Sequence, residues 1–297
     1  MGTLDCIISM RTNEMRSDVF DPDRALKYLN ELCEIGPRIS GTAGMIRQRE
    51  FLRQHFEPLC DRFAFQEFSA RQESRAEPTS MANLIASWGL DRQDRVLLCA
   101  HYDTRPIADR EPNSEDWHRP FLGANDGASG VALLMELARQ LDSKSLKVGV
   151  DLVCFDGEEY IFEPDDDSYF LGSTHFAADY RKRQWPGRYL GAVLLDMVAG
   201  RDAEFPVEAF SAGWAGELAG EIWGIAEEQD CPSFLPEIAQ DVMDDHLPLN
   251  LAGIPAVVII DSSYEHWHKL SDTPENCSAQ TLGQVARVVI GWLDLVT

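Results

Sequence analysis

Two adjacent glutamates that follow a sharp turn are the residues of this sequence best suited to chemistry. Glu158 and Glu159 come directly after Asp156-Gly157, at the end of an apolar run over residues 150–155. An apolar run bounded by a turn is typical of a strand buried on both faces of a sheet. Side chains that leave a tight turn diverge, so one carboxylate can bind a metal while the other faces a substrate. A solvated acidic turn would give the same local sequence, so the glutamate pair alone does not distinguish a functional site from such a turn.

Three further apolar runs repeat this design, each ending in a histidine or a carboxylate. Residues 96–100 precede His101-Tyr102-Asp103, residues 192–195 precede Asp196, and residues 256–260 precede Asp261 and then His266-Trp267-His268. In an open α/β sheet, sites form beyond the carboxyl ends of the strands. Chance placement of surface charge would not follow strand direction four times, so we expect a functional site at this edge.

The elements that must position these residues alternate between strands and helices. Helices are predicted over about 22–35, 44–57, 131–141, 174–180, 214–229, 244–253 and 278–296, with further strands at 62–68 and 81–88. No repeat, linker or composition break divides the chain. The predicted fold is a single α/β domain, a mostly parallel mixed sheet with helices on both faces. Residues 1–20 are predicted as an N-terminal extension and 21–297 as the catalytic domain.

Several segments near the predicted site have more than one explanation. Asp126, in the run G-A-N-D-G-A-S-G, is either a helix N-cap or a metal ligand. The long loop 104–124 is either functional or disordered. The acidic segment 163–167 is expected to be a solvated loop that borders the pocket, and His175 a surface or half-buried helix residue.

Composition excludes several partners. The net charge of −24 and the pI near 4.5 argue against nucleic acid and anionic membranes. No apolar run reaches the roughly 18 residues that a membrane span needs. The seven cysteines are scattered and include Cys99 and Cys154 inside predicted buried strands, so we expect reduced core residues. With no signal peptide recognised, a cytoplasmic location is expected.

The residue types offered at this edge favour zinc. One histidine with two carboxylates, leaving a coordination position open, is a donor set of catalytic zinc sites, whereas calcium would use more oxygens and no histidine. His268 follows Trp267 in the loop after a strand, where a lone histidine would usually have no ligand role. The other strands that end at the same edge make it a candidate ligand.

The motifs H-Y-D, A-N-D-G-A-S-G, F-D-G-E-E, L-L-D, D-D-H and H-W-H together resemble those of the zinc exopeptidase superfamily of aminopeptidases. Within it, the chain is most similar to the zinc-dependent glutaminyl-peptide cyclotransferases, over about residue 37 to the last helix. The motifs H-x-D, N-D-G and E-E are common to both branches. Trp267-His268 and the Asp-Asp-His at 244–246 favour the cyclases. No partner for a disulfide at Cys99 is evident, unlike in the secreted cyclases.

The resemblance implies a role for each matching residue. In the cyclase branch, Asp126, Glu159 and His268 would bind one zinc, and Glu158 would be the general acid and base. Asp196 and Asp245 would form its hydrogen-bonded acidic surroundings, and Trp267 would line the pocket. In the aminopeptidase branch, His101 and Asp196 would hold a second zinc, with Asp126 bridging.

Three functions are compatible with these residues. The first is cyclisation of N-terminal glutamine of peptides or proteins to pyroglutamate with release of ammonia. The second is hydrolysis of N-terminal residues by a di-zinc aminopeptidase. The third is a catalytically silent binding domain, which the intact set of predicted ligands argues against.

Overall fold

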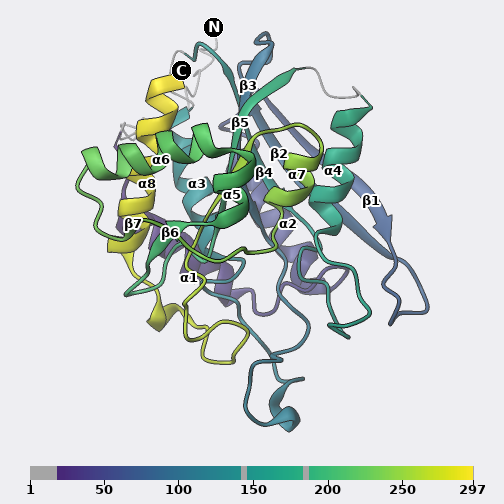
Figure 1. Cartoon of the computed structure of the whole chain (residues 1–297). Coiled ribbons are helices and arrows are strands. Elements are labelled where there is room, and N and C mark those ends of the chain that lie inside the picture. Colours follow the sequence, from purple (N-terminus) through teal and green to yellow (C-terminus); the bar gives the residue numbers. More distant parts are fainter. Residues whose placement is uncertain (1–18, 142–145, 183–186, 297) are drawn as a thin grey trace, which may run out of the picture.

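Among residues 19–141, 146–182 and 187–296, which the computed structural model describes, a six-stranded mixed sheet forms the centre of the molecule (Figure 1). In spatial order its strands are β1 (Arg62–Ala70), β2 (Thr79–Trp88), β4 (Gly149–Phe155), β3 (Asp94–His101), β5 (Arg188–Asp196) and β8 (Ala256–Ile260). Strands β4, β3, β5 and β8 run parallel, whereas β2 is antiparallel to both β1 and β4. The predicted fold class is confirmed. The predicted extension 1–20 lies almost wholly outside the described residues and stays a prediction.

The four parallel strands are buried on both faces because successive side chains enter two different cores. In β3, Val96 and Leu98 pack into the larger core, while Leu97 and Cys99 pack into the smaller one. The same alternation holds along β4, β5 and β8. This explains why their sequences are continuously apolar rather than alternating.

Helices cover both faces of the sheet (Figure 1). The larger core is closed by α1 (Pro22–Glu34), α2 (Ala43–Phe56), α3 (Ser129–Leu141), α6 (Gly216–Glu228) and α8 (Ala279–Val296). The smaller core is closed by α4 (Leu171–Arg181) and α7 (His246–Leu251), and α5 (Ala209–Trp214) packs beside β8. Two 3₁₀ turns, η1 (Ser114–Asp116) and η2 (Pro274–Asn276), complete the helical elements of the described residues. No described helix is both long and apolar enough to span a membrane.

The only charged residue in the apolar run of β4 is Asp151, and a buried network accounts for it. Arg95 of β3 donates to both of its carboxylate oxygens, at 2.6 and 2.8 Å, and the Tyr189 hydroxyl donates at 2.8 Å. All three residues are buried. A buried charge that is paired and hydrogen-bonded in this way is tolerated inside a sheet.

The structure differs from the sequence-based expectation at three places. Trp214, the expected start of the helix predicted over 214–229, instead ends α5 and is 49% exposed, because α6 begins separately at Gly216. The two-stranded sheet of β6 (Phe205–Val207) and β7 (Phe234–Ile238) was not expected. The acidic loop 163–167 is not wholly solvated, since Asp167 is buried and accepts hydrogen bonds from the backbone of Phe162 and Glu163.

Candidate active site

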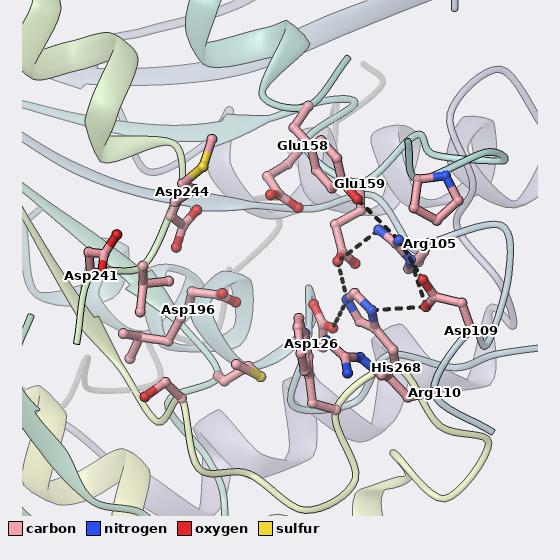
Figure 2. Close-up of a pocket in the computed structure, with 18 of the residues that line it drawn as sticks. Arg105, Asp109, Arg110, Asp126, Glu158, Glu159, Asp196, Asp241, Asp244 and His268 are labelled. Carbon is pink, nitrogen blue, oxygen red and sulfur yellow. Dashed lines mark hydrogen bonds and ion pairs between the residues drawn. The ribbon is translucent and has the colours of Figure 1, made fainter. Parts of the chain in front are cut away.

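The carboxyl ends of three parallel strands, β4, β5 and β8, lead into one pocket of about 540 Å³. His101, at the end of β3, lies next to it, with Nε2 3.2 Å from Asp126 Oδ1 and from Asp196 Oδ1. Strand β4 leads into Glu158 and Glu159, β5 ends at Asp196, and β8 leads into the loop that carries His268. All four side chains line the pocket together with Asp126 (Figure 2). Trp267 lines it as well. The predicted edge of the sheet therefore does bring these residues together. Their roles remain proposals.

Asp126, Glu159 and His268 form a buried three-donor cluster. One donor atom from each residue lies within 4.8 Å of the others. His268 Nε2 contacts Glu159 Oε1 at 2.5 Å and lies 3.6 Å from Asp126 Oδ2. Asp126 Oδ2 and Glu159 Oε2 are buried without a hydrogen-bond partner among the described residues. Unpaired buried carboxylate oxygens beside an imidazole fit a divalent metal ion, because burying an unpaired acceptor is otherwise costly.

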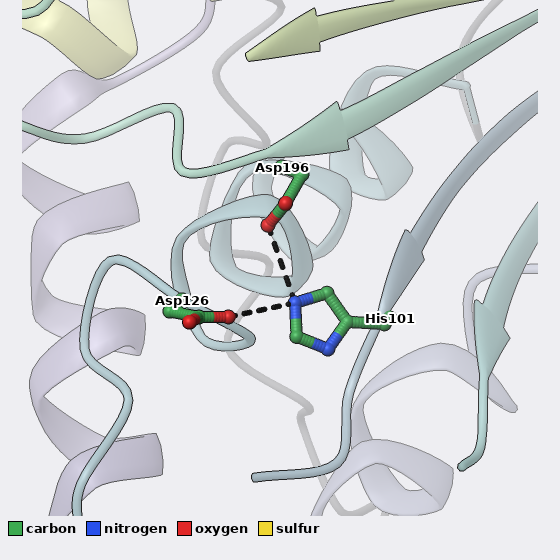
Figure 3. A group of neighbouring side chains, drawn as sticks. All are labelled: His101, Asp126 and Asp196. Carbon is green, nitrogen blue, oxygen red and sulfur yellow. Dashed lines mark hydrogen bonds and ion pairs between the residues drawn. The ribbon is translucent and has the colours of Figure 1, made fainter. Parts of the chain in front are cut away.

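A second possible metal cluster shares Asp126 (Figure 3). His101 Nε2 lies 3.2 Å from Asp126 Oδ1 and 3.2 Å from Asp196 Oδ1. His101 and Asp126 are buried, and Asp196 is partly buried. The side chains of the two-metal alternative are thus also assembled, although the His101 ring already contacts both carboxylates.

The turn that carries the glutamate pair is fixed by its own sequence and by Asp103. Gly157 has φ +71°, and a Cβ there would lie 2.8 Å from Met81 Sδ. The carboxylate of Asp103, just beyond β3, accepts hydrogen bonds from the backbone N–H groups of Glu158 and Glu159, at 3.0 and 3.1 Å. These contacts fix the backbone from which the two side chains leave.

The two glutamates differ in electrostatic environment. Burial raises the pKa of Glu158 well above its ordinary value, and the charge of Glu159 raises it further. Burial also acts to raise the pKa of Glu159. The charge of His268, their hydrogen bond and the charge of Arg105 outweigh burial and lower that pKa to about 2. Glu158 is thus suited to carrying a proton, whereas Glu159 is suited to staying an anionic ligand.

The role predicted for Asp245 stays a prediction, and the geometry adds its neighbour Asp244. After burial and the charge of Glu159, the charges of Asp244 and Asp245 also raise the pKa of Glu158. Asp245 does not line the pocket; its carboxylate accepts a hydrogen bond from the Ser173 hydroxyl of α4. The neighbouring Asp244 lines the pocket instead, and Figure 2 shows its carboxylate facing the same space as Glu158 and Asp196. Burial raises the pKa of Asp244 well above its ordinary value, and the charges of Asp196 and Asp245 add to this. The sequence does not show which of these two adjacent aspartates faces the pocket, because that depends on the path of the backbone.

Two residues of the long loop 104–124 belong to the site and were missed from the sequence. Arg105 is buried, with Nη1 3.6 Å from Glu159 Oε1 and Nη2 2.8 Å from Asp109 Oδ2. Asp109 in turn lies 3.0 Å from His268 Nδ1. Carboxylates that contact the outer nitrogen of a ligand histidine commonly orient its ring. The i,i+4 spacing of Arg105 and Asp109 directly after H-Y-D-T could have marked them.

Trp267 and its neighbours form one wall of the pocket. The Trp267 ring centroid lies 4.2 Å from that of His268, and the Arg110 guanidinium lies 4.5 Å from the Trp267 centroid. His268 itself adopts φ +54°, a conformation that favours glycine. The expected half-buried position of His175 on α4 is confirmed, with its ring stacked on Phe68.

Residues 83–293 match the model of peptidase family M28, and the chain belongs to that family. Over 284 residues it is 26% identical to glutaminyl-peptide cyclotransferase of Bos taurus, an alignment that covers 85% of this chain and 76% of that protein. Among solved structures, Fimbriiglobus ruber glutaminyl cyclase is 48% identical with a TM-score of 0.90, covering 93% of this chain and 95% of that one. A structure described as a leucine aminopeptidase precursor from Bacteroides thetaiotaomicron is 29% identical with a TM-score of 0.86, covering 92% and 96%.

These similarities confirm the predicted relationship to the glutaminyl cyclases and the zinc exopeptidase-like fold. The family and the donor set together indicate a zinc-dependent enzyme. The six cysteines within the described residues are free, and Cys99 lies inside β3. The cytoplasmic location expected from the sequence stays a prediction.

Proposed function

We propose that this chain is a glutaminyl-peptide cyclotransferase, which converts the N-terminal glutamine of a peptide or protein to pyroglutamate with release of ammonia. The proposal is carried by one observation: Glu158, a buried carboxylate with a raised pKa, lies beside a three-donor cluster in which Asp126 Oδ2 and Glu159 Oε2 lack hydrogen-bond partners. The 48% identity to a glutaminyl cyclase over nearly the whole chain supports the same function.

One zinc would be held by Asp126, Glu159 and His268. When bound there, zinc would act as a Lewis acid toward the γ-carboxamide of the glutamine and stabilise developing negative charge on its oxygen. Asp109 contacts the far nitrogen of His268 and Arg105 contacts Glu159, so these two residues would keep the ligands in position.

The chain's own residues would supply the proton transfers. The α-amine of the substrate forms a bond to its own δ-carbon, and Glu158 accepts the proton that the amine gives up. Glu158 then returns that proton to the amide nitrogen as the carbon–nitrogen bond breaks and ammonia leaves. Because nucleophile and electrophile belong to one residue, the substrate itself provides the proximity. Glu158 needs a raised pKa for both transfers, which its burial and the charge of Glu159 provide.

The pocket walls would orient the substrate. Trp267 presents an aromatic surface next to His268, where it can pack against the glutamine side chain. Asp196 and Asp244 face the same space as Glu158 and would receive the α-amino group. The peptide N-terminus would then lie beside Asp196 and Asp244, with the rest of the peptide leading away from them.

A second function, di-zinc aminopeptidase activity, is favoured by the assembly of His101, Asp126 and Asp196 (Figure 3). It would use Glu158 to activate a water that attacks the first peptide bond. Against it, Glu159 Oε2, a buried oxygen without a hydrogen-bond partner, belongs to the first cluster alone, whereas Asp126 is shared by both clusters.

A product assay separates these functions. Peptides that begin with glutamine and matched peptides that begin with leucine are incubated with the purified protein, and products are identified by mass and by ammonia release. We expect each glutamine peptide to lose one ammonia with every residue retained, no leucine to be released, and one zinc per chain. Free leucine with two tightly held zinc ions would establish the aminopeptidase instead, and no product from either peptide would favour a binding domain.

A further inference from the structure

Three consecutive backbone N–H groups that lead into Asp126 all donate to one residue, Asp272. The N–H of Ala124 donates to the Asp272 carbonyl at 3.4 Å. The N–H groups of Asn125 and Asp126 donate to the two oxygens of the Asp272 carboxylate, at 2.9 and 3.1 Å. Asp272 is completely buried, so water does not compete for these bonds.

Other contacts to the segment that Asp272 holds reach its carbonyl groups: the Ser129 hydroxyl donates to the Asn125 carbonyl, and Arg38 donates to the Gly123 carbonyl at 2.9 Å. Gly123 has φ +58° and Gly127 has φ +92°, so Asp126 lies between two positions of left-handed backbone. Glycine adopts such angles without steric strain, but it can also adopt many others, so these two glycines alone do not fix the backbone. Asp272 is the acceptor that bonds the N–H of Asp126 itself and so restricts the conformation of that residue directly.

Asp272 also belongs to the loop that supplies His268. It follows His268 by only four residues, and its own N–H donates to the Lys269 carbonyl at 2.9 Å. The Tyr264 hydroxyl donates to Asp272 Oδ1 at 2.9 Å and orients the carboxylate. One short loop thus carries the imidazole of the cluster and the acceptor that fixes the backbone of an opposite ligand.

We propose that Asp272 is a positioning residue that sets Asp126 against His268 before any metal binds. The inference rests on the zinc site of the proposed function but concerns how that site is assembled. Asp103 makes the equivalent two contacts to the backbone of Glu158 and Glu159, so both carboxylate ligands are held through their main chain. Outer contacts of this kind typically change metal affinity 10–100-fold when they are removed.

The test is zinc affinity, measured by competition with a chromogenic chelator on the metal-depleted full chain, with circular dichroism to check the fold. We expect Asp272→Asn to weaken zinc binding by about 10–100-fold, since an amide offers only one acceptor to the two N–H groups. Tyr264→Phe keeps the Asp272 carboxylate and removes only the hydroxyl that orients it. We therefore expect a loss of zinc affinity of about threefold or more, but smaller than that of Asp272→Asn.

Asp167→Asn is the matched control. Asp167 is also buried and also accepts backbone N–H bonds, from Phe162, Glu163 and Ser74, but none of these is a predicted ligand. The zinc affinity of the Asp167→Asn protein should stay within about twofold of the wild type, since this substitution removes no contact to a proposed ligand.

Two results would overturn the proposal: unchanged zinc affinity in Tyr264→Phe or in folded Asp272→Asn, or an equal loss in Asp167→Asn. If Asp272→Asn does not fold, the Tyr264→Phe result decides. Zinc affinity is measured without substrate, so it tests the role of Asp272 independently of activity. If the affinities follow the expected pattern but the wild-type protein forms no pyroglutamate, the proposed function is refuted and the role of Asp272 is not.

Discussion

Replacing Glu158 by glutamine removes the group that we expect to move protons and keeps the shape of its side chain. The Glu158 side chain is 10% exposed, and its backbone N–H remains bonded to Asp103 in the variant. Its neighbour Glu159 cannot take over, because that carboxylate contacts His268 and Arg105. Loss of general acid and base catalysis costs about 10²–10⁴ in rate, or roughly 3–5 kcal/mol of transition-state stabilisation. Because both transfers depend on Glu158, we expect a loss of at least about 10² in kcat.

The measurement is ammonia release from a short glutamine peptide, together with the zinc content of the same preparation. Glu158→Gln should retain zinc, since Glu158 is not one of the three proposed ligands. Glu159→Gln is the matched control and should lose zinc, because an amide is a poorer ligand than a carboxylate. A fully zinc-loaded Glu158→Gln enzyme within about tenfold of the wild-type kcat would show that the proton carrier is another residue.

Four other substitutions test separate parts of the structure. Trp267→Ala should raise KM for a glutamine peptide more than it weakens zinc, because the ring lines the pocket without donating a ligand; unchanged KM and kcat would leave it only a packing role. Asp244→Asn should lower kcat by about tenfold or more, while Asp245→Asn, whose amide oxygen can still accept from α4, should stay within about threefold; the reverse order would restore the role first expected for Asp245. Burial lowers the pKa of His55 to about 4 from 6.5, so folding favours its neutral form. Stability from this group is present above pH 6.5 and lost as pH falls toward 4, which amounts to about 2 kcal/mol between pH 7.5 and 5. Urea unfolding of His55→Gln should lack that part of the pH dependence, and an identical pH dependence in both proteins would contradict the assignment.

The strands that build the site could be predicted because their apolar runs reflect burial on both faces, a property of the sequence itself. Those runs located β3, β4, β5 and β8 and therefore the edge at which His101, Glu158, Glu159, Asp196 and His268 meet. The helix predicted over 214–229 corresponds to α6, whereas α5 was not predicted. The apolar spacing continues from α5 into α6, and only Ala215, between Trp214 and Gly216, separates the two helices.

The contacts that hold the site together were harder to predict, since they join residues far apart in the chain. Asp103 contacts backbone groups 55 residues away, and Asp272 contacts backbone groups 146 residues away. A side chain that accepts hydrogen bonds from backbone N–H groups far along the chain leaves no periodic pattern in the sequence. Arg105 was missed for a related reason, because a buried arginine in a loop is indistinguishable from a solvated one until its carboxylate partners are placed.

The loop between β8 and α8 restricts where this chain can change in length. Within residues 264–272 it carries the hydroxyl of Tyr264, the ring of Trp267, the imidazole of His268 and the carboxylate of Asp272. One inserted or deleted residue there would shift several of these groups out of register together, so the segment should accept substitutions more readily than insertions. Exposed residues 112–115 make no such set of contacts and offer a better place for an inserted tag or label.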